Sequence, residues 1–184
     1  MVGNVGAVMV PLRASVDASA EPASDADRAA VTALLGRPPQ GRFEVVVRHA
    51  DGSPLVVRNA PLLDDGTPMP TRWWLVGEPE RTLVSRLESG GGVRRAENEV
   101  PAAAVAAAHA RYAAERDAAL PVNHTGPRPA GGVGGTRRGL KCLHAHYAWW
   151  LAGGDDPVGQ WVADRLADAG PGSTRDAGAG GSAG

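Results

Sequence analysis

The order of strand-type and helix-type segments along the chain is the feature that most constrains its fold. Segments rich in β-branched and aromatic residues come early, at 42–49, 54–58 and 71–76. One helix-type segment precedes them, and four follow at 78–89, 101–120, 139–152 and 157–166. Strands that cluster early and helices that cluster late predict an α+β fold, in which a small antiparallel sheet of about three strands packs against four to five helices.

Turn and cap residues mark several of these boundaries. Ser24 or Asp25 suits the N-cap of the first helix, and Gly36 suits its end. Asp51 and Gly52, between the first two strand-type segments, indicate a hairpin with a slightly long turn.

Composition limits the folded region to one domain. The chain has 184 residues, of which 43% are hydrophobic but only 4% aromatic, so its five tryptophans must fill much of a small core. We expect a single α+β domain at residues 24–168. Disordered tails are expected at 1–23 and at 169–184, the latter ending in DAGAGGSAG.

Charge and cysteine content exclude several classes of protein. The 19 basic and 20 acidic residues create no overall field that would attract nucleic acid or an anionic membrane. No apolar run approaches the roughly 18 residues of a membrane span. A single cysteine cannot form an internal disulfide, which favours a reducing compartment. The sequence therefore predicts a cytoplasmic protein with no nucleic-acid partner and no membrane span.

The densest chemistry lies at residues 131–146, GGVGGTRRGLKCLHAH, which hold the only cysteine and the only lysine. We expect this glycine-rich loop to run into the helix at 139–152. Amides at a helix start attract anions, and glycine lets a ligand approach closely. The segment therefore predicts binding of a phosphate or carboxylate by Arg137, Arg138, Gly139 and Lys141. It is not a P-loop, because leucine stands where the P-loop lysine belongs.

Cys142 and His146 are four residues apart, so they share one face of a continuous helix, whereas His144 faces away. The pair could be a nucleophilic thiol and its base, since nearby cations favour the thiolate. It could instead supply two zinc ligands, with His109 and a carboxylate completing the set. An inert cysteine and hydrogen-bonded histidines explain the same residues, and the leading interpretation assigns no metal ligand.

His109, Tyr112 and Arg116 recur at helical spacing on the segment 101–120 and form one polar stripe. This stripe could face Cys142 and His146 across a helical hairpin. A solvated helix face would show the same pattern.

Six short motifs, in this order and spacing, resemble the actinobacterial family catalogued as domain of unknown function 501. They are LGRPPQG (35–41), DGTPMPTRWWL (65–75), SRLESGG (85–91), AHARYAAERD (108–117), LKCLHAHYAWWLAGG (140–154) and DPVG (156–159). That family usually has asparagine where Asp156 stands. The resemblance implies no reaction, but it marks the KCLHAH block and the helix of His109 and Arg116 as hallmarks of one site. Family members often lie in genomes near enolase, a septum-formation initiator protein and an exopolyphosphatase.

These observations support one leading function and two alternatives. The leading function is binding of a phosphorylated or carboxylated small molecule. Cys142, His146 and His109 would line that pocket, Arg116 and Tyr112 would contact the ligand, and His146 would move a proton if chemistry occurs.

The first alternative is a non-catalytic protein of cell division or envelope synthesis, which would dock a protein partner through the tryptophans at 73–74 or 149–150. The second is a zinc-dependent enzyme. The sequence leaves the reaction and any cofactor open.

Overall fold

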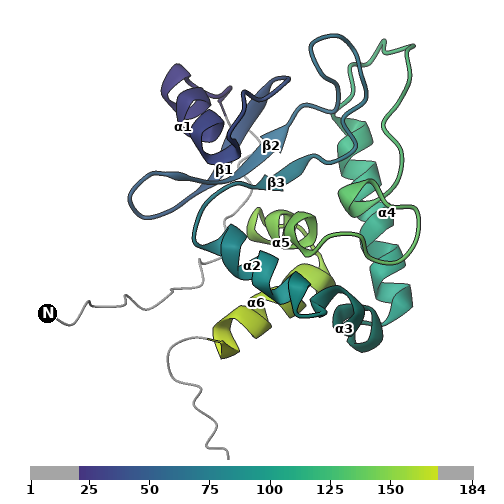
Figure 1. Ribbon diagram of the computed structural model, residues 1–184. Helices are drawn as coiled ribbons and strands as arrows, with labels where there is room; N and C mark the ends of the chain where they lie inside the picture. The colour runs from purple at the N-terminus through teal and green to yellow at the C-terminus, as the bar shows by residue number, and fades with distance from the viewer. Residues whose placement is uncertain (1–20, 170–184) are drawn as a thin grey trace, which may run out of the picture.

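The computed structural model describes residues 21–169, which form a three-stranded antiparallel sheet with helices on both faces (Figure 1). The strand order is β1-β2-β3, with β1 (Phe43–Arg48), β2 (Pro54–Asn59) and β3 (Trp73–Leu75). The helices are α1 (Asp25–Leu35), α2 (Glu80–Ser89), α3 (Gly92–Glu99), α4 (Ala102–Ala118), α5 (Leu143–Leu151) and α6 (Pro157–Asp168), with a 3-10 turn η1 (Val133–Gly135). This arrangement confirms the α+β fold and its antiparallel sheet.

The cap residues of α1 act as the sequence predicts. Ser24 is the N-cap, and its side chain accepts a hydrogen bond from the Asp27 N–H while Asp27 bonds back to the Ser24 backbone. Gly36 ends the helix with φ +70°, a conformation that glycine adopts without strain. At the hairpin, Gly52 also takes a positive φ, so β1 and β2 pair as expected.

The structure departs from the prediction at the start of one helix and in the presence of another. The helix expected from residue 139 begins only at Leu143, because Gly139 has φ +60° and Cys142 is extended with φ −156° and ψ 122°. Helix α3 was not expected, since the glycines at 90–92 indicated the end of helical structure. Gly91, with φ +83°, instead forms a tight turn from which α3 restarts directly.

Two apolar clusters hold the sheet between helices. Val31, Phe43, Val57 and Val76 pack between α1 and one face of the sheet. The larger cluster lies on the other face, where α5 contacts β3 and α6 (Figure 1). Every residue of α5 except His144 is buried, so α5 is the central helix of this core.

The tails predicted at 1–23 and 169–184 lie outside the described residues, apart from their inner ends at 21–23 and 169. Within the described part of the chain, none of the helices combines the length and the apolar character that crossing a membrane requires.

Candidate functional site

Cys142 lies immediately before α5 and outside its first turn. It is the N-cap residue of that helix, and its extended backbone points its side chain in a direction that helical spacing does not describe. The chain turns into this position at Gly139, after which the Leu140 N–H donates to Glu97 Oε1 at 3.0 Å. The expectation that His144 faces away from Cys142 is therefore wrong.

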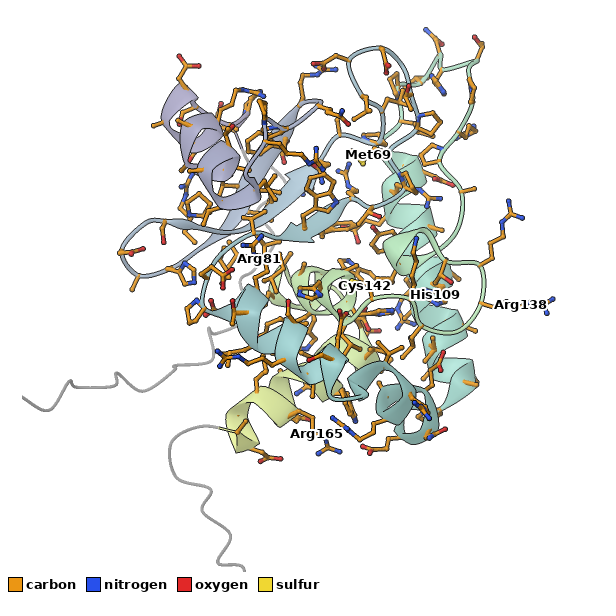
Figure 2. The ribbon with its side chains drawn as sticks, in the orientation of Figure 1. Met69, Arg81, His109, Arg138, Cys142 and Arg165 are labelled. Carbon is orange, nitrogen blue, oxygen red and sulfur yellow. The ribbon has the colours of Figure 1, made fainter. Side chains whose placement is uncertain are left out.

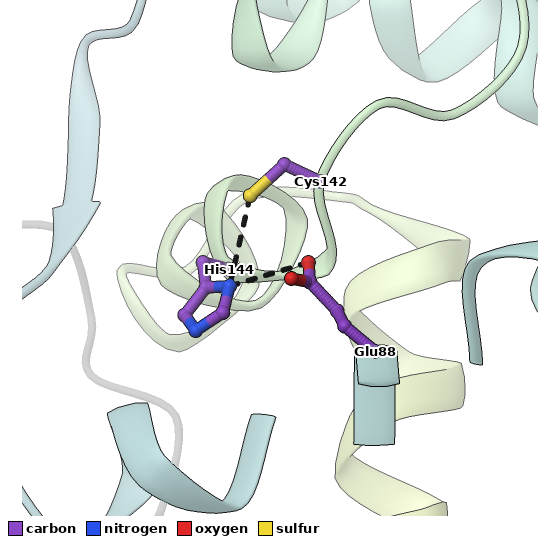
Figure 3. Close-up of side chains that lie close together, drawn as sticks. All are labelled: Glu88, Cys142 and His144. Carbon is purple, nitrogen blue, oxygen red and sulfur yellow. Dashed lines mark hydrogen bonds and ion pairs between the residues drawn. The ribbon is translucent and has the colours of Figure 1, made fainter. Parts of the chain in front are cut away.

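Three side chains of different chemistry converge beside Cys142 (Figure 3). The Cys142 Sγ atom lies 3.7 Å from His144 Nδ1, and the same nitrogen lies 3.2 Å from Glu88 Oε1. Glu88 comes from the last turn of α2, and its Oε1 atom also accepts the Leu143 N–H at 2.5 Å. One donor atom from each of Glu88, Cys142 and His144 lies within 4.8 Å of the other two.

The opposite side of the His144 ring fixes its orientation. Its Nε2 atom lies 3.2 Å from the Arg81 carbonyl oxygen and 3.1 Å from Ser85 Oγ. A carbonyl oxygen only accepts hydrogen bonds, so Nε2 carries the proton that it donates to Arg81. The Nδ1 atom therefore faces both Cys142 and Glu88.

The surroundings of His144 stabilise its charged form. Burial is the largest single influence and disfavours the imidazolium. The hydrogen bond to Cys142, the negative charge of Glu88 and the Arg81 carbonyl together outweigh burial and raise the pKa of His144 to about 9.

Cys142 and His144 line a pocket of about 440 Å³ between β3, α2 and the start of α5. Figure 2 shows Cys142 and Arg81 on neighbouring elements at this place. Its wall includes the apolar faces of Trp73, Trp74 and Leu75 and several polar side chains, namely Thr71, Glu78, Arg81, Thr82, Ser85, Cys142 and His144. A small molecule held in this pocket would therefore contact both the thiol and the imidazole.

His146 lies in a different environment. It is fully buried, and its Nδ1 atom bonds to Asp156 Oδ2 at 2.7 Å. Asp156 in turn caps α6 by accepting the N–H groups of Val158 and Gly159. His146 does not line the pocket beside Cys142, and its role as proton-transfer group stays a prediction without a substrate path.

His109 connects α4 to the glycine-rich loop through two hydrogen bonds. Its Nδ1 atom accepts the Val133 N–H at 3.1 Å, so Nε2 carries the proton and donates to the Gly139 carbonyl at 3.0 Å. The ring also lies 5.6 Å from that of His146. Because both ring nitrogens bond to backbone groups of the glycine-rich loop, His109 holds that loop against α4.

Tyr112 and Arg116 are buried, so the polar stripe of α4 faces the interior and not solvent. The Tyr112 hydroxyl accepts the Arg72 N–H at 2.7 Å, and burial raises its pKa to about 12. Arg116 donates to the Gly131 carbonyl at 2.6 Å and pairs with Asp117. Both side chains fasten loops to α4, and neither lines the pocket beside Cys142.

The predicted anion-binding residues lie at another cavity. Arg137, Arg138, Gly139 and His109 border a space of about 390 Å³ against α4, and Glu97 lies on the same wall. Arg138 extends away from the body of the molecule (Figure 2), and Lys141 is exposed. The amides of Leu140 and Leu143 already bond to glutamate side chains of the protein itself, which leaves two fewer amides for an external anion.

Burial also limits the tryptophan surfaces proposed for docking. Trp73, Trp149 and Trp150 are 1%, 2% and 7% exposed, which makes them core residues. Trp74 is half-buried, with the Arg37 guanidinium 5.8 Å from its ring centre.

Sequence reasoning missed Glu88 and set His144 aside. Glu88 is 54 positions from Cys142 in the chain, so no local spacing connects them. Two signals were available in the sequence. One is the motif SRLESGG, which contains Glu88, and the other is the short Cys-x-His spacing at a helix start.

A model of the family described as "Protein of unknown function (DUF501)" matches residues 45–164. The chain belongs to this family. The matched region contains Glu88, Cys142 and His144 and runs from within β1 to within α6, so the family model spans the whole site. No curated protein and no solved structure matches the chain.

Proposed function

We propose that this DUF501 protein is a zinc-dependent hydrolytic enzyme whose metal ligands are Glu88, Cys142 and His144. The observation that carries the proposal is the convergence of a carboxylate, a thiol and an imidazole nitrogen within 4.8 Å, with Cys142 and His144 at the wall of a pocket. These three groups are the usual protein ligands of zinc.

The spacing of the donor atoms suits a tetrahedral ion. Zinc bonds of about 2.3 Å to sulfur and about 2.0 Å to nitrogen and oxygen place the sulfur about 3.5 Å from the nitrogen, and the nitrogen about 3.3 Å from the oxygen. The distances here are 3.7 Å between Cys142 Sγ and His144 Nδ1 and 3.2 Å between His144 Nδ1 and Glu88 Oε1. Each of these two distances lies within about 0.2 Å of the tetrahedral value.

The bond from His144 to the Arg81 carbonyl supports the same assignment. Metal-binding histidines usually donate their second ring N–H to a carbonyl or carboxylate, which fixes the tautomer and aims the free nitrogen at the ion. His144 Nε2 does so at 3.2 Å, while Nδ1 faces the other two ligands.

Three protein ligands are the number found in catalytic zinc sites, whereas structural sites have four. A zinc ion with an open position lowers the pKa of water bound there and polarises a substrate carbonyl or phosphoryl group. The protein's own residues would orient that substrate. Arg81 and the hydroxyls of Thr71, Thr82 and Ser85 line the same pocket, opposite an apolar wall. A small ester or amide with both polar and apolar parts fits this lining.

Metal analysis of the full chain, purified without a tag and loaded with zinc, tests the proposal. We expect about one zinc ion per chain, and at least about 100-fold weaker binding in Cys142→Ala and His144→Ala. Cobalt loading should produce a thiolate charge-transfer band that requires Cys142. His124→Ala, which changes a histidine in the loop after α4, is the matched control and should leave metal content unchanged.

Hydrolysis of a panel of chromogenic esters and amides then tests the reaction. Activity should fall on chelation, return with zinc and be absent from Cys142→Ala. A metal content near zero in the loaded wild type, or zinc retained by both ligand variants, would refute the metal site. A loaded protein without hydrolytic activity would refute the reaction alone.

A second candidate function is binding of a phosphorylated or carboxylated small molecule near the glycine-rich loop. The cavity of about 390 Å³ beside Arg137, Arg138 and Gly139 favours it. Thermal stabilisation by inorganic phosphate should then decrease in the double variant Lys141→Ala, Arg138→Ala. Stabilisation that survives both changes would remove its basis.

A further inference from the structure

Arg72 carries a charge that no carboxylate in the described part of the chain neutralises. It is half-buried just before β3, and residues 21–169 provide no acidic oxygen within 4.0 Å of its nitrogens. Its Nη1 atom donates to the Asn59 carbonyl at 3.0 Å, and its guanidinium lies 5.4 Å from the Trp73 ring centre. Its Nε atom is buried without a hydrogen-bond partner.

The two acidic side chains whose negative charge acts on Arg72, Glu115 and Glu44, have other hydrogen-bond partners. Glu44 Oε2 accepts from both Arg58 Nη2 at 2.6 Å and Arg58 Nε at 2.8 Å. Glu115 Oε2 accepts the indole N–H of Trp149 at 3.0 Å. Burial, followed by the positive charge of Arg58, lowers the pKa of Arg72, although Glu115 and Glu44 act in the opposite direction. Proteins rarely keep a partly desolvated charge unpaired, because the free-energy cost of desolvation is offset only by interaction with a partner.

A large cavity of about 900 Å³ adjoins this guanidinium. Its wall comes from the start of β1, the end of β2, the loop after β2 and the C-terminal end of α4, which lie together in Figure 1. The cavity is lined by three arginines, Arg42, Arg58 and Arg72. Arg42 is exposed, while Leu62 and Leu63 contribute apolar surface. Three carboxylates, Glu44, Asp64 and Glu115, line the cavity as well, so the charges of its wall balance. What the cavity offers an anion is the Arg72 guanidinium, which no carboxylate of residues 21–169 pairs with, beside an apolar wall.

We propose that this cavity is a second ligand site, which binds a small organic oxyanion, a carboxylate or a phosphate, with Arg72 as the anchor. The oxyanion would neutralise the Arg72 guanidinium, since planar guanidinium groups bind carboxylate and phosphate oxygens in charge-assisted pairs. Arg42 reaches the ligand from the cavity rim, and the leucines cover its apolar part. The site shares no residue with the zinc ligands, so it stands or falls independently of the proposed hydrolytic function.

A structural role for Arg72 makes a different prediction. If the arginine served only to hold the Asn59 carbonyl and the Trp73 ring, its removal would destabilise the protein whether or not an anion is present. If it serves a ligand, removal of the unpaired charge relieves a desolvation cost in the free protein and abolishes anion binding.

The experiment measures thermal stability and calorimetric binding of the full chain with inorganic phosphate and, separately, with succinate. The protein is first treated with a chelator, so that an anion bound to zinc cannot contribute. We expect saturable stabilisation of the wild type by at least one of the two probes, and the more effective probe distinguishes a phosphate from a carboxylate ligand.

Arg72→Met should weaken binding of that probe by at least about tenfold, as expected for loss of a charge-assisted hydrogen bond. Without an anion, the variant should be at least as stable as the wild type. Arg94→Met, at an exposed arginine of α3 that lines neither this cavity nor the one beside Arg137, is the matched control and should bind normally. Arg42→Ala, at an exposed position, should weaken binding by a smaller factor, and it tests the site even if Arg72→Met fails to fold.

Wild-type protein that neither probe stabilises would overturn the proposal. Equal binding by wild type, Arg72→Met and Arg42→Ala would do the same.

Discussion

His144 and His146 lie two residues apart on α5, and each imidazole bonds to a carboxylate, yet their surroundings are opposite. His144 is the one α5 residue that is not buried, and its Nδ1 atom faces a thiol and a carboxylate at a pocket wall. His146 is fully buried, and its Nδ1 atom bonds to Asp156 within the core. Access to a pocket, and not the presence of a carboxylate partner, therefore separates a candidate metal ligand from a structural histidine.

The difference arises from where each carboxylate is attached. Glu88 comes from α2, beside the one α5 residue that is not buried, and it accepts the first amide of that helix. Asp156 is the N-cap of α6, which packs against the buried side of α5. A histidine–carboxylate pair therefore lies at the start of α5 in one case, and between the packed helices α5 and α6 in the other.

Alanine substitution of the two histidines tests this comparison and should produce the largest effect on stability. His146→Ala leaves the buried Asp156 carboxyl without its partner and opens a cavity, so it should lower the free energy of unfolding by about 4 kcal/mol. His144→Ala, measured in chelator, should cost at most about half as much, because its side chain is 22% exposed and water can replace part of its hydrogen bonding. Urea denaturation followed by circular dichroism measures both values. Similar losses in the two variants would contradict the distinction.

Asp156→Asn should produce an intermediate effect. Asparagine keeps an oxygen to cap the Val158 and Gly159 amides, and its NH₂ group can donate to His146 Nδ1 if the ring adopts the other tautomer. We expect a loss of about 1.5 kcal/mol in the free energy of unfolding, well below the loss for His146→Ala. Nitrogen NMR of the imidazole should show the change of tautomer. A loss as large as that of His146→Ala would show that the carboxylate itself is required.

The smallest effect on stability is expected for a surface ion pair, Arg48–Asp27. It is a reference for the two histidine–carboxylate pairs. The hydrogen bond from Arg48, which outweighs burial and is supported by bonds to Ser24, lowers the pKa of Asp27 from 3.8 to about 2. A lowered pKa stabilises the folded state above the ordinary pKa, and this contribution is lost as the pH falls from about 4 to about 2. Asp27→Asn should therefore cost about 1 kcal/mol or less at neutral pH and nothing near pH 2. Denaturation curves across that range test the sign, and a cost that grows on acidification would refute it.

Local sequence signals predicted the elements whose boundaries depend on their own residues. Ser24 and Gly36 bound α1, and Gly52 turns the hairpin, because capping and positive φ are properties of single residues and their neighbours. The start of α5 could not be predicted in this way. The Glu97 and Glu88 side chains that bond to the amides of Leu140 and Leu143 come from other helices.

The candidate site shows the same division. The sequence by itself determined that the thiol, two imidazoles and a glycine-rich turn lie next to one another at a helix start, because these are neighbours in the chain. Only the tertiary structure decided that Cys142 meets His144, and that Glu88 joins them from α2. The physical reason is that an N-cap residue is extended, so helical spacing does not describe it, and the third donor depends on how two helices pack.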